Sequence, residues 1–317
     1  MSEKPEKKVI AVVGATGAQG GGLATAILAD VNGEFAVRAL TRNAASEKAR
    51  ELAARGAEVV VADIRDAGSL AKAFEGAYGA FLVTDFWEHG SPEREKEDAA
   101  TMARVAGAAE LQHVIWSTLD NTREHIPLGD DRMPTLMGTY KVPHFDAKAE
   151  ANQLFTDAGV PTTFLETTFY WENLLGPMAP QRDQDGALVL ALAMGDSKLA
   201  GIAVEDIGKT ALGILKRGTD FIGRTVSIAG EHLTGAEMAV VLSEVLGEPV
   251  NYVPVPFEVL RAQKWAGAAE SANMFQFYAE VPEFVAVRYL DFVRFLNPAL
   301  LTFGQWARAH KDEFLCG

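Results

Sequence analysis

Three glycines near the N-terminus have the spacing of a phosphate-binding loop. Gly14, Gly17 and Gly20 follow the apolar run 9–13 in the order G-x-x-G-x-x-G. The first permits a tight turn from strand to helix, the second lets the backbone approach a pyrophosphate, and the third lets the helix pack closely on the sheet. The start of that helix would direct free N–H groups at the phosphates. The spacing differs from G-x-G-x-x-G, and a glycine-rich turn without a ligand is the alternative.

Charged side chains end the second and third apolar runs. Arg42 follows the run 36–40, where a protein that binds NAD commonly carries an acid for the ribose hydroxyls. An arginine fits a 2′-phosphate at this place, so NADP(H) is the predicted cofactor, and a solvated arginine is the alternative. Asp63 follows the run 59–62, where its carboxylate could meet the adenine amine or cap the following turn.

A histidine and a lysine have the spacing of neighbours on one helix face. Lys148 stands four residues after His144, and such a pair points the same way. With an ordinary pKa of about 6.5, the imidazole could act as a general acid near neutral pH. It could equally cap or pack the start of its helix, which Pro143 fits. The other histidines lack metal-ligand spacing and there is no G-x-S-x-G motif, so we expect neither a metal site nor a serine hydrolase.

These residues require a sheet whose strands alternate with helices. Buried parallel strands are predicted at 9–13, 36–40, 59–62, 80–83, 114–116 and 162–166. Helices are predicted at 19–28, 45–54, 69–74, 92–109 and about 146–157. The charged run 92–98 is expected on a solvated helix face. The alternation predicts an α/β fold with a Rossmann-type, doubly wound parallel sheet.

The segment 120–143 interrupts this alternation. It carries prolines at 127, 134 and 143, glycines at 129 and 138, and mixed charge. Long loops inside compact domains are usually lids, binding loops or disordered segments. We therefore expect a weakly held segment that responds to cofactor.

The chain beyond about residue 170 has shorter elements and many aromatic residues. One helix is predicted to begin at Thr234, whose hydroxyl can cap it, and to run to Leu246. We predict an NADP-binding Rossmann domain at 1–165 and a smaller α+β C-terminal lobe for a substrate or partner at 166–317. An exchange of segments between the two stays open.

The composition limits the expected partners and compartment. The 317 residues carry 29 Lys and Arg against 43 Asp and Glu, a formal net charge of -14, so direct binding to nucleic acid or a membrane surface is not expected. The single cysteine, Cys316, excludes an internal disulfide framework. No apolar run reaches the ~20 residues of a membrane span, and the N-terminus has no signal-peptide core. We expect a cytoplasmic protein.

Seven segments spread over nearly the whole chain form a family pattern. They are GATGAQGG (14–21), VRALTRN (37–43), LVTDFWE (82–88), HFDAKAE (144–150), YWENLL (170–175), ANMFQFYA (272–279) and LTFGQW (301–306). Together they resemble the NmrA-like group of atypical short-chain dehydrogenases/reductases, and most closely its HSCARG-type NADPH-sensing branch. The resemblance implies that NADP contacts Gly14, Thr16, Gly17, Ala18, Gln19, Gly20, Arg42, Asp63, Thr84, Lys148, Tyr170 and Asn173.

The resemblance also assigns roles near the predicted helix pair. Standard members of the superfamily carry Tyr-x-x-x-Lys there, with a serine just before it. In this chain His144 replaces the tyrosine, Lys148 is kept, and Ser117 stands near the serine's place. Lys148 and His144 are therefore the candidate catalytic residues, with Tyr140 as an alternative proton donor. Tyr170 would lie beside the nicotinamide or be an ordinary core aromatic.

Two functions remain open. The resemblance and the missing tyrosine favour a redox sensor or regulator, in which NADP(H) orders the segment 120–143 and changes how a partner protein binds. The lysine and the apolar C-terminal lobe favour an NADPH-dependent reductase of a small carbonyl, enone, quinone or imine substrate. A scaffold without a ligand would leave the glycine loop unexplained, and a homodimer stays open in either case.

Overall fold

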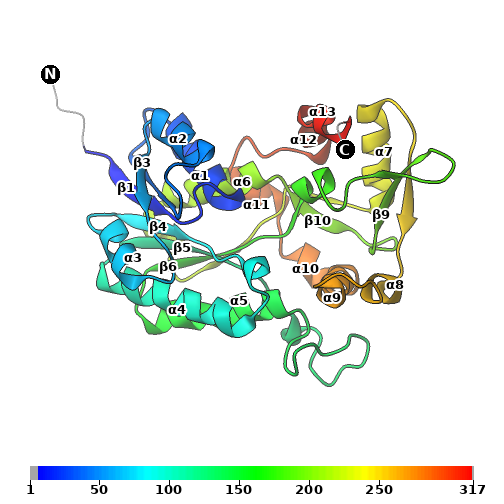
Figure 1. Cartoon of the computed structure of the whole chain (residues 1–317), viewed down its shortest axis with the longest axis horizontal. Helices are drawn as coiled ribbons and strands as arrows, with labels where there is room; N and C mark the ends of the chain where they lie inside the picture. Colours follow the sequence, from blue (N-terminus) through cyan, green and yellow to red (C-terminus); the bar gives the residue numbers. More distant parts are fainter. Residues whose placement is uncertain (1–5, 316–317) are drawn as a thin grey trace. The chain divides into compact units, whose positions relative to one another are not determined.

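A seven-stranded sheet forms the centre of the first of two units in the chain (Figure 1). The computed structural model describes residues 6–315. The strands of this sheet are β1 (Lys8–Val12), β2 (Phe35–Thr41), β3 (Glu58–Val61), β4 (Gly79–Leu82), β5 (His113–Thr118), β6 (Thr162–Glu166) and β11 (Thr225–Ser227). Their order is β11-β6-β5-β4-β1-β2-β3, and β1 to β6 pair in parallel.

The strand order reverses at β1. Val12 pairs with Ala39 of β2 on one side and with Phe81 of β4 on the other. The runs Ile10–Val12 and Ala80–Leu82 are 0% exposed, as expected of parallel strands covered on both faces. The predicted Rossmann-type fold is therefore confirmed. In such sheets ligands bind outside the carboxyl ends of the strands, at the reversal.

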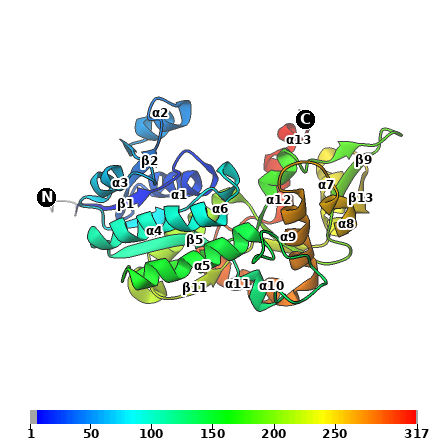
Figure 2. The ribbon, with the colours of Figure 1, turned by 60° about the horizontal axis from the view of Figure 1, so that its bottom comes forward.

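Helices pack on this sheet. They are α1 (Ala18–Ala29), α2 (Glu47–Ala54), α3 (Ala67–Phe74), α4 (Pro92–Ala108), α5 (Pro143–Asp157) and α6 (Val204–Leu215), with short 3₁₀ turns η1 (Phe86–Glu88) and η4 (Gly218–Phe221). Figure 2 shows α4 and α5 side by side, and both share a hydrophobic cluster with α3 and the strands. Helices α1 and α6 touch through backbone, because a Cβ on Gly208 would lie 2.1 Å from the carbonyl carbon of Gly22.

The second unit contains two three-stranded sheets and short helices. One sheet has the order β12-β10-β7 and the other β13-β9-β8. The strands are β7 (Phe169–Tyr170), β8 (Gln181–Arg182), β9 (Leu188–Leu192), β10 (Leu199–Ile202), β12 (Glu231–Leu233) and β13 (Val250–Pro254). The helices are η2 (Thr122–Glu124), η3 (Trp171–Leu175), α7 (Gly235–Leu246), α8 (Phe257–Arg261), α9 (Ala268–Glu280), α10 (Pro282–Ala286), α11 (Leu290–Leu296), α12 (Phe303–Ala309) and α13 (Lys311–Leu315). Thr234 caps α7 as predicted, in a capping box with Glu237.

The two units interleave along the sequence. The first comprises the chain up to Asp120, Ala147–Glu166 and Ile207–Val226, and the second comprises the remaining segments. Helix α5 therefore begins in the second unit and ends in the first. The division into domains at residues 165 and 166 stays a prediction.

Two helices differ from their predicted form. Glu95 and Asp98 of α4 are 0% and 4% exposed, so the run 92–98 is not a solvated face. The inward stripe of α4 continues through these two acids, and both have cationic partners. Helix α5 begins at Pro143 rather than near residue 146. Proline suits the first helical position, where its missing N–H leaves no hydrogen bond unmade.

Two kinds of feature are absent from the part of the chain that the structure describes. Within residues 6–315, no helix is long and apolar enough to cross a membrane. The same residues contain no group of three or more His, Cys, Asp or Glu placed to hold a metal ion. Cys316 lies outside the described residues.

Candidate functional site

The glycine loop has the geometry of a phosphate cradle. Gly14 lies in the left-handed region with φ of 65°, which favours glycine, and its carbonyl accepts a 2.8 Å hydrogen bond from the Gly17 N–H. A Cβ on Gly20 would lie 2.5 Å from the carbonyl oxygens of Val13 and Gly14, so only glycine fits there. Gly17 is the N-cap of α1 and has no side chain to satisfy the first N–H groups. Those groups suit an anion.

The other predicted loop residues surround the start of α1. Thr16 and Gln19 are half-buried and Ala18 is exposed. The Ser117 hydroxyl, at the end of β5, donates a 2.7 Å hydrogen bond to Oε1 of Gln19. The structure therefore brings the end of β5 against the glycine loop.

Arg42 lies just beyond β2 and is already paired. Its Nη1 is 2.6 Å from Oε1 of Glu88 in η1, and its side chain is 64% exposed. The hydrogen bond between them raises the pKa of the Arg42 guanidinium and lowers the pKa of the Glu88 carboxyl. The Asp63 carboxylate accepts the Arg65 N–H at 2.9 Å, so it caps the following turn. A contact of Asp63 with adenine stays a prediction.

Lys148 and Thr84, both predicted, lie together in the first unit. The lysine Nζ is 2.5 Å from the Thr84 hydroxyl, 3.1 Å from the Thr84 carbonyl and 2.6 Å from Oε1 of Glu95. The Thr84 hydroxyl also donates to Oε1 of Glu95. An ammonium has three N–H donors, so these three acceptors account for all of them. A ribose hydroxyl could bind Lys148 only by replacing one of them.

Glu95 is a functional candidate that the sequence reasoning missed. Its second oxygen lies 3.5 Å from Nε2 of His89, whose Nδ1 accepts the Ser91 N–H. The other ring nitrogen of a neutral His89 therefore carries the proton and faces the carboxylate. Pro92, Glu95 and Met102 have the spacing of one helix face, and this face of α4 is buried. The periodicity could therefore have predicted from the sequence that Glu95 is buried.

His144 is held by a second acid that the sequence reasoning missed. Oε1 of Glu270, in the first turn of α9, lies 2.6 Å from Nδ1 of His144 and accepts its backbone N–H at 2.7 Å. Both side chains are buried. Because an ionised carboxylate only accepts, this contact places a proton on Nδ1. A carboxylate that fixes the tautomer and orientation of an imidazole is a recurrent arrangement in general acid–base catalysis. Glu270 stands just before the motif 272–279, and no spacing rule links it to His144.

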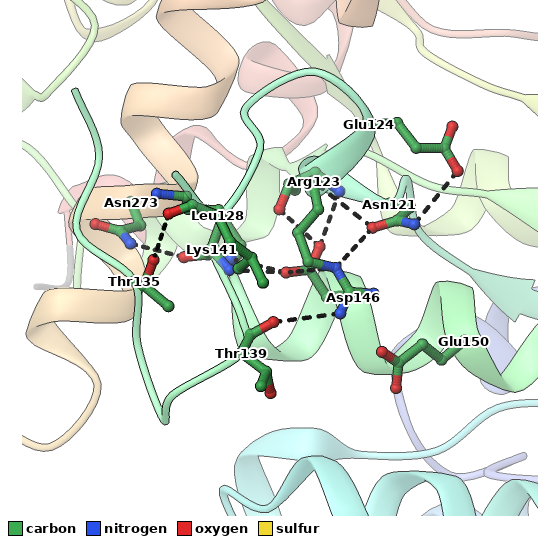
Figure 3. A network of polar contacts seen from close by, with 12 residues as sticks. Asn121, Arg123, Glu124, Leu128, Thr135, Thr139, Lys141, Asp146, Glu150 and Asn273 are labelled. Atoms are coloured by element: carbon green, nitrogen blue, oxygen red, sulfur yellow. Dashed lines mark hydrogen bonds and ion pairs between the residues drawn. The ribbon is translucent and has the colours of Figure 1, made fainter. Parts of the chain in front are cut away.

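The segment 121–146 is anchored rather than weakly held (Figure 3). The fully buried Asp146 carboxylate accepts the Thr122 N–H and hydroxyl at 2.8 and 2.6 Å and the Lys141 N–H at 2.9 Å. Burial raises the pKa of Asp146. From α9, the Asn273 amide donates to the carbonyls of Lys141 and Pro134 at 2.6 and 2.8 Å. The expectation of a weakly held segment is therefore wrong, because side-chain hydrogen bonds replace the missing secondary structure.

Tyr140 shares this anchoring. Its side chain is 4% exposed, and the Arg123 guanidinium lies 5.5 Å from the ring centre. Ile126 and Met133 of the same segment are 0% exposed. The expectation of a tyrosine free to move in as a proton donor is therefore wrong as well.

Tyr170 and Asn173 lie in a well-fixed turn of the second unit. The Tyr170 hydroxyl is 3.4 Å from the Thr167 hydroxyl, and both Tyr170 and Asn173 are half-buried. Between them, the Glu172 carboxylate accepts the Val204 N–H at 3.0 Å and the Trp306 indole N–H at 3.1 Å. Burial raises the pKa of Glu172. The turn is thus held by Glu172, and cofactor contacts of its neighbours stay a prediction.

Comparisons with known proteins agree with this fold. The sequence model of the NmrA-like family matches residues 6–299 of this chain. The NAD(P)H azoreductase of Xenophilus azovorans is 31% identical over 314 residues, which cover 96% of this chain and 99% of the azoreductase. The solved structure of NmrA, a negative transcriptional regulator, in complex with NADP has a TM-score of 0.80 at 23% identity and covers 98% of both chains. The Citrobacter sp. triphenylmethane reductase complexed with NADP(H) has a TM-score of 0.74 at 20% identity, over 96% of this chain and 99% of that one.

These solved structures share the fold, while the match along residues 6–299 identifies the family. The finer resemblance to the HSCARG-type branch stays a prediction. The azoreductase, which by its name uses NAD(P)H, is similar to this chain over nearly its full length. The chain belongs to the NmrA-like family.

Proposed function

We propose that the protein is an NADPH-dependent reductase of a small conjugated substrate, such as a quinone, enone, imine, carbonyl or azo compound. The observation that carries the proposal is the buried His144–Glu270 pair, 2.6 Å apart. An imidazole oriented in this way is suited to giving up a proton. The azoreductase, 31% identical over nearly the whole chain, supports a reductase and adds the azo group to the candidate substrates.

The residues of the first unit fit a phosphorylated dinucleotide. Gly17 and Gly20 leave room for a pyrophosphate at the start of α1, where a Cβ on Gly20 would block the turn. Arg42 offers an exposed guanidinium for the 2′-phosphate. When bound, NADPH supplies a hydride. The predicted contacts of Asp63 and of Tyr170 and Asn173 belong to the same proposal.

Lys148 would hold the cofactor ribose by exchanging one of its present partners. The Glu95 carboxylate lies 2.6 Å from the Lys148 ammonium and is its buried counter-charge. The Thr84 hydroxyl is the partner most easily exchanged, because it can keep its own hydrogen bond to Glu95. Lys148 is then a binding and positioning group rather than a proton donor.

His144 would supply the proton. Glu270 accepts the proton on Nδ1, so a proton to be transferred would be the one on Nε2. Proton transfer by a positioned acid contributes roughly 10²–10⁴ in rate. His144→Ala and Glu270→Gln should lower kcat within that range and leave the Kd for NADPH within about twofold of wild type.

The test is NADPH oxidation, followed by absorbance, across azo dyes, quinones, enones, imines and aldehydes. Lys148→Met should instead weaken NADPH binding, because charge-assisted hydrogen bonds disappear. Turnover that is unchanged in His144→Ala would remove the histidine from the mechanism. No turnover on the whole panel, despite tight NADPH binding, would contradict the reductase.

A regulator that responds to NADP(H) is the second candidate. It is favoured by the saturated ammonium of Lys148, since cofactor binding would have to rearrange the contacts among Lys148, Thr84 and Glu95. Hydrogen exchange of residues 82–98 with and without NADPH tests this. Changed protection together with no turnover would favour regulation, and unchanged protection would contradict it.

A further inference from the structure

The ion pair between Arg42 and Glu88, in the first unit, is held in place by the turn η1. Phe86 is 2% exposed and anchors η1, and the Glu88 N–H donates to the Asp85 carbonyl at 3.2 Å. Glu88 therefore projects from a fixed turn, and its carboxylate lies 2.6 Å from Nη1 of Arg42. This turn follows β4, next to the strand reversal at β1.

Other acids add to the negative charge around Arg42. Asp63 and Asp85 both act on the guanidinium and, after Glu88, raise its pKa. After Arg42, the neighbours that lower the pKa of the Glu88 carboxyl are Arg65 and His89. The position closest to the Arg42 guanidinium is therefore already occupied by the Glu88 carboxylate. A 2′-phosphate that approaches Arg42 would have to compete for it.

We propose that Glu88 is a specificity-determining residue, a carboxylate that competes with the cofactor 2′-phosphate for Arg42. The inference rests on the proposed NADP(H) binding. NADPH has to displace Glu88 or share the guanidinium with it, and it is repelled by the carboxylate in both cases. NADH has no 2′-phosphate, so the ion pair can stay intact. Glu88 thus lowers the preference for NADPH below what Arg42 alone would give.

Glu88→Gln tests the proposal, because it removes the charge and keeps the shape. Binding of NADPH, NADH and 2′,5′-ADP to the purified full chain is measured by calorimetry. NADPH and 2′,5′-ADP should bind about threefold to tenfold more tightly, as expected from the loss of an exposed ion pair and one nearby negative charge. The Kd for NADH should stay within about twofold.

The chain offers a matched control on β2, the strand that Arg42 follows. Arg38 of β2 pairs with Glu58 at 2.7 Å, so Glu58→Gln also removes one carboxylate from an arginine. This control should leave all three affinities unchanged. In an Arg42→Ala background, the gain from Glu88→Gln should shrink to twofold or less.

The outcomes separate the two proposals. Equal NADPH affinity in Glu88→Gln and wild type, with tight binding in both, overturns the role of Glu88 and leaves the cofactor proposal standing. An equal gain for NADH and NADPH also overturns it, because the effect would not involve the 2′-phosphate. No NADPH binding by the wild-type chain overturns both.

Discussion

His113, the first residue of β5, should make the stability of the first unit depend on pH. Its side chain is 0% exposed, and Nε2 lies 2.8 Å from the Thr163 hydroxyl. That hydroxyl donates to the Phe221 carbonyl at 2.9 Å, so its oxygen accepts the proton on Nε2. A second proton would go to Nδ1, which is buried and has no hydrogen-bond partner. Burial lowers the pKa of His113 from 6.5 to about 4.

The sign of the effect follows from which state binds the proton. Between pH 6.5 and about 4 the unfolded chain protonates His113 and the folded chain does not, so stability is lost as pH falls through this range. At about 1.4 kcal/mol per pH unit, the loss amounts to about 3 kcal/mol. Burial also lowers the pKa of His232, which acts in the same direction, whereas burial raises the pKa of Asp146 and Glu172. The measurement must therefore isolate His113.

His113→Gln isolates it, because the amide can still donate to Thr163 and does not titrate. Urea unfolding of wild type and variant is followed by circular dichroism from pH 4 to 7.5, together with amide exchange of residues 113–118. The variant should gain about 3 kcal/mol relative to wild type on going from pH 7.5 to 4. His125→Gln, at an exposed histidine, is the control and should show no such gain. A difference between His113→Gln and wild type that does not vary with pH would refute the burial argument.

Two further substitutions test the nucleotide loop and the anchored segment. Gly20→Ala should weaken NADPH binding more than tenfold, a loss of more than about 1.4 kcal/mol of binding free energy, because the new Cβ would lie 2.5 Å from two carbonyl oxygens. In the same calorimetric titration Gly129→Ala, where nothing lies within 4 Å, should bind NADPH like wild type, and normal binding by Gly20→Ala would contradict the cradle. Asn273→Ala should destabilise the segment 121–146 by about 1–3 kcal/mol, since it leaves two carbonyls without donors. Limited proteolysis should then cut this segment faster than in wild type or in the exposed Asn251→Ala, and equal rates would show that Asn273 does not hold it.

The parts predicted well from sequence depend on short-range rules. The continuous apolar runs predicted the parallel strands, and the glycine spacing predicted the turn before α1. Thr234 predicted where α7 begins. Each of these features depends on residues close together in the chain, so periodicity and capping chemistry are enough to predict it.

The parts that were missed depend on tertiary partners. Glu270 meets His144 across 126 positions of sequence, and Asn273 meets Lys141 across 132. Within a charged run, a carboxylate such as Glu95 is expected to be exposed to solvent. Its burial is possible because the Lys148 ammonium lies 2.6 Å away. The segment 120–143 was expected to be weakly held for the same reason, since its hydrogen bonds come from Asp146 and from α9 rather than from its own composition.

The backbone contact between α1 and α6 has a consequence for the order of folding. The Gly22–Gly208 contact joins the helix that follows the glycine loop to a helix nearly two hundred residues later in the chain. Domains fold during synthesis as their segments leave the ribosome, and contacts distant in sequence form late. A nascent chain that ends before α6 would expose the glycine face of α1. The first unit is therefore completed only after both of the second unit's first two segments, Asn121–Asp146 and Thr167–Asp206, have been synthesised, so the packing of α6 on α1 is a late step.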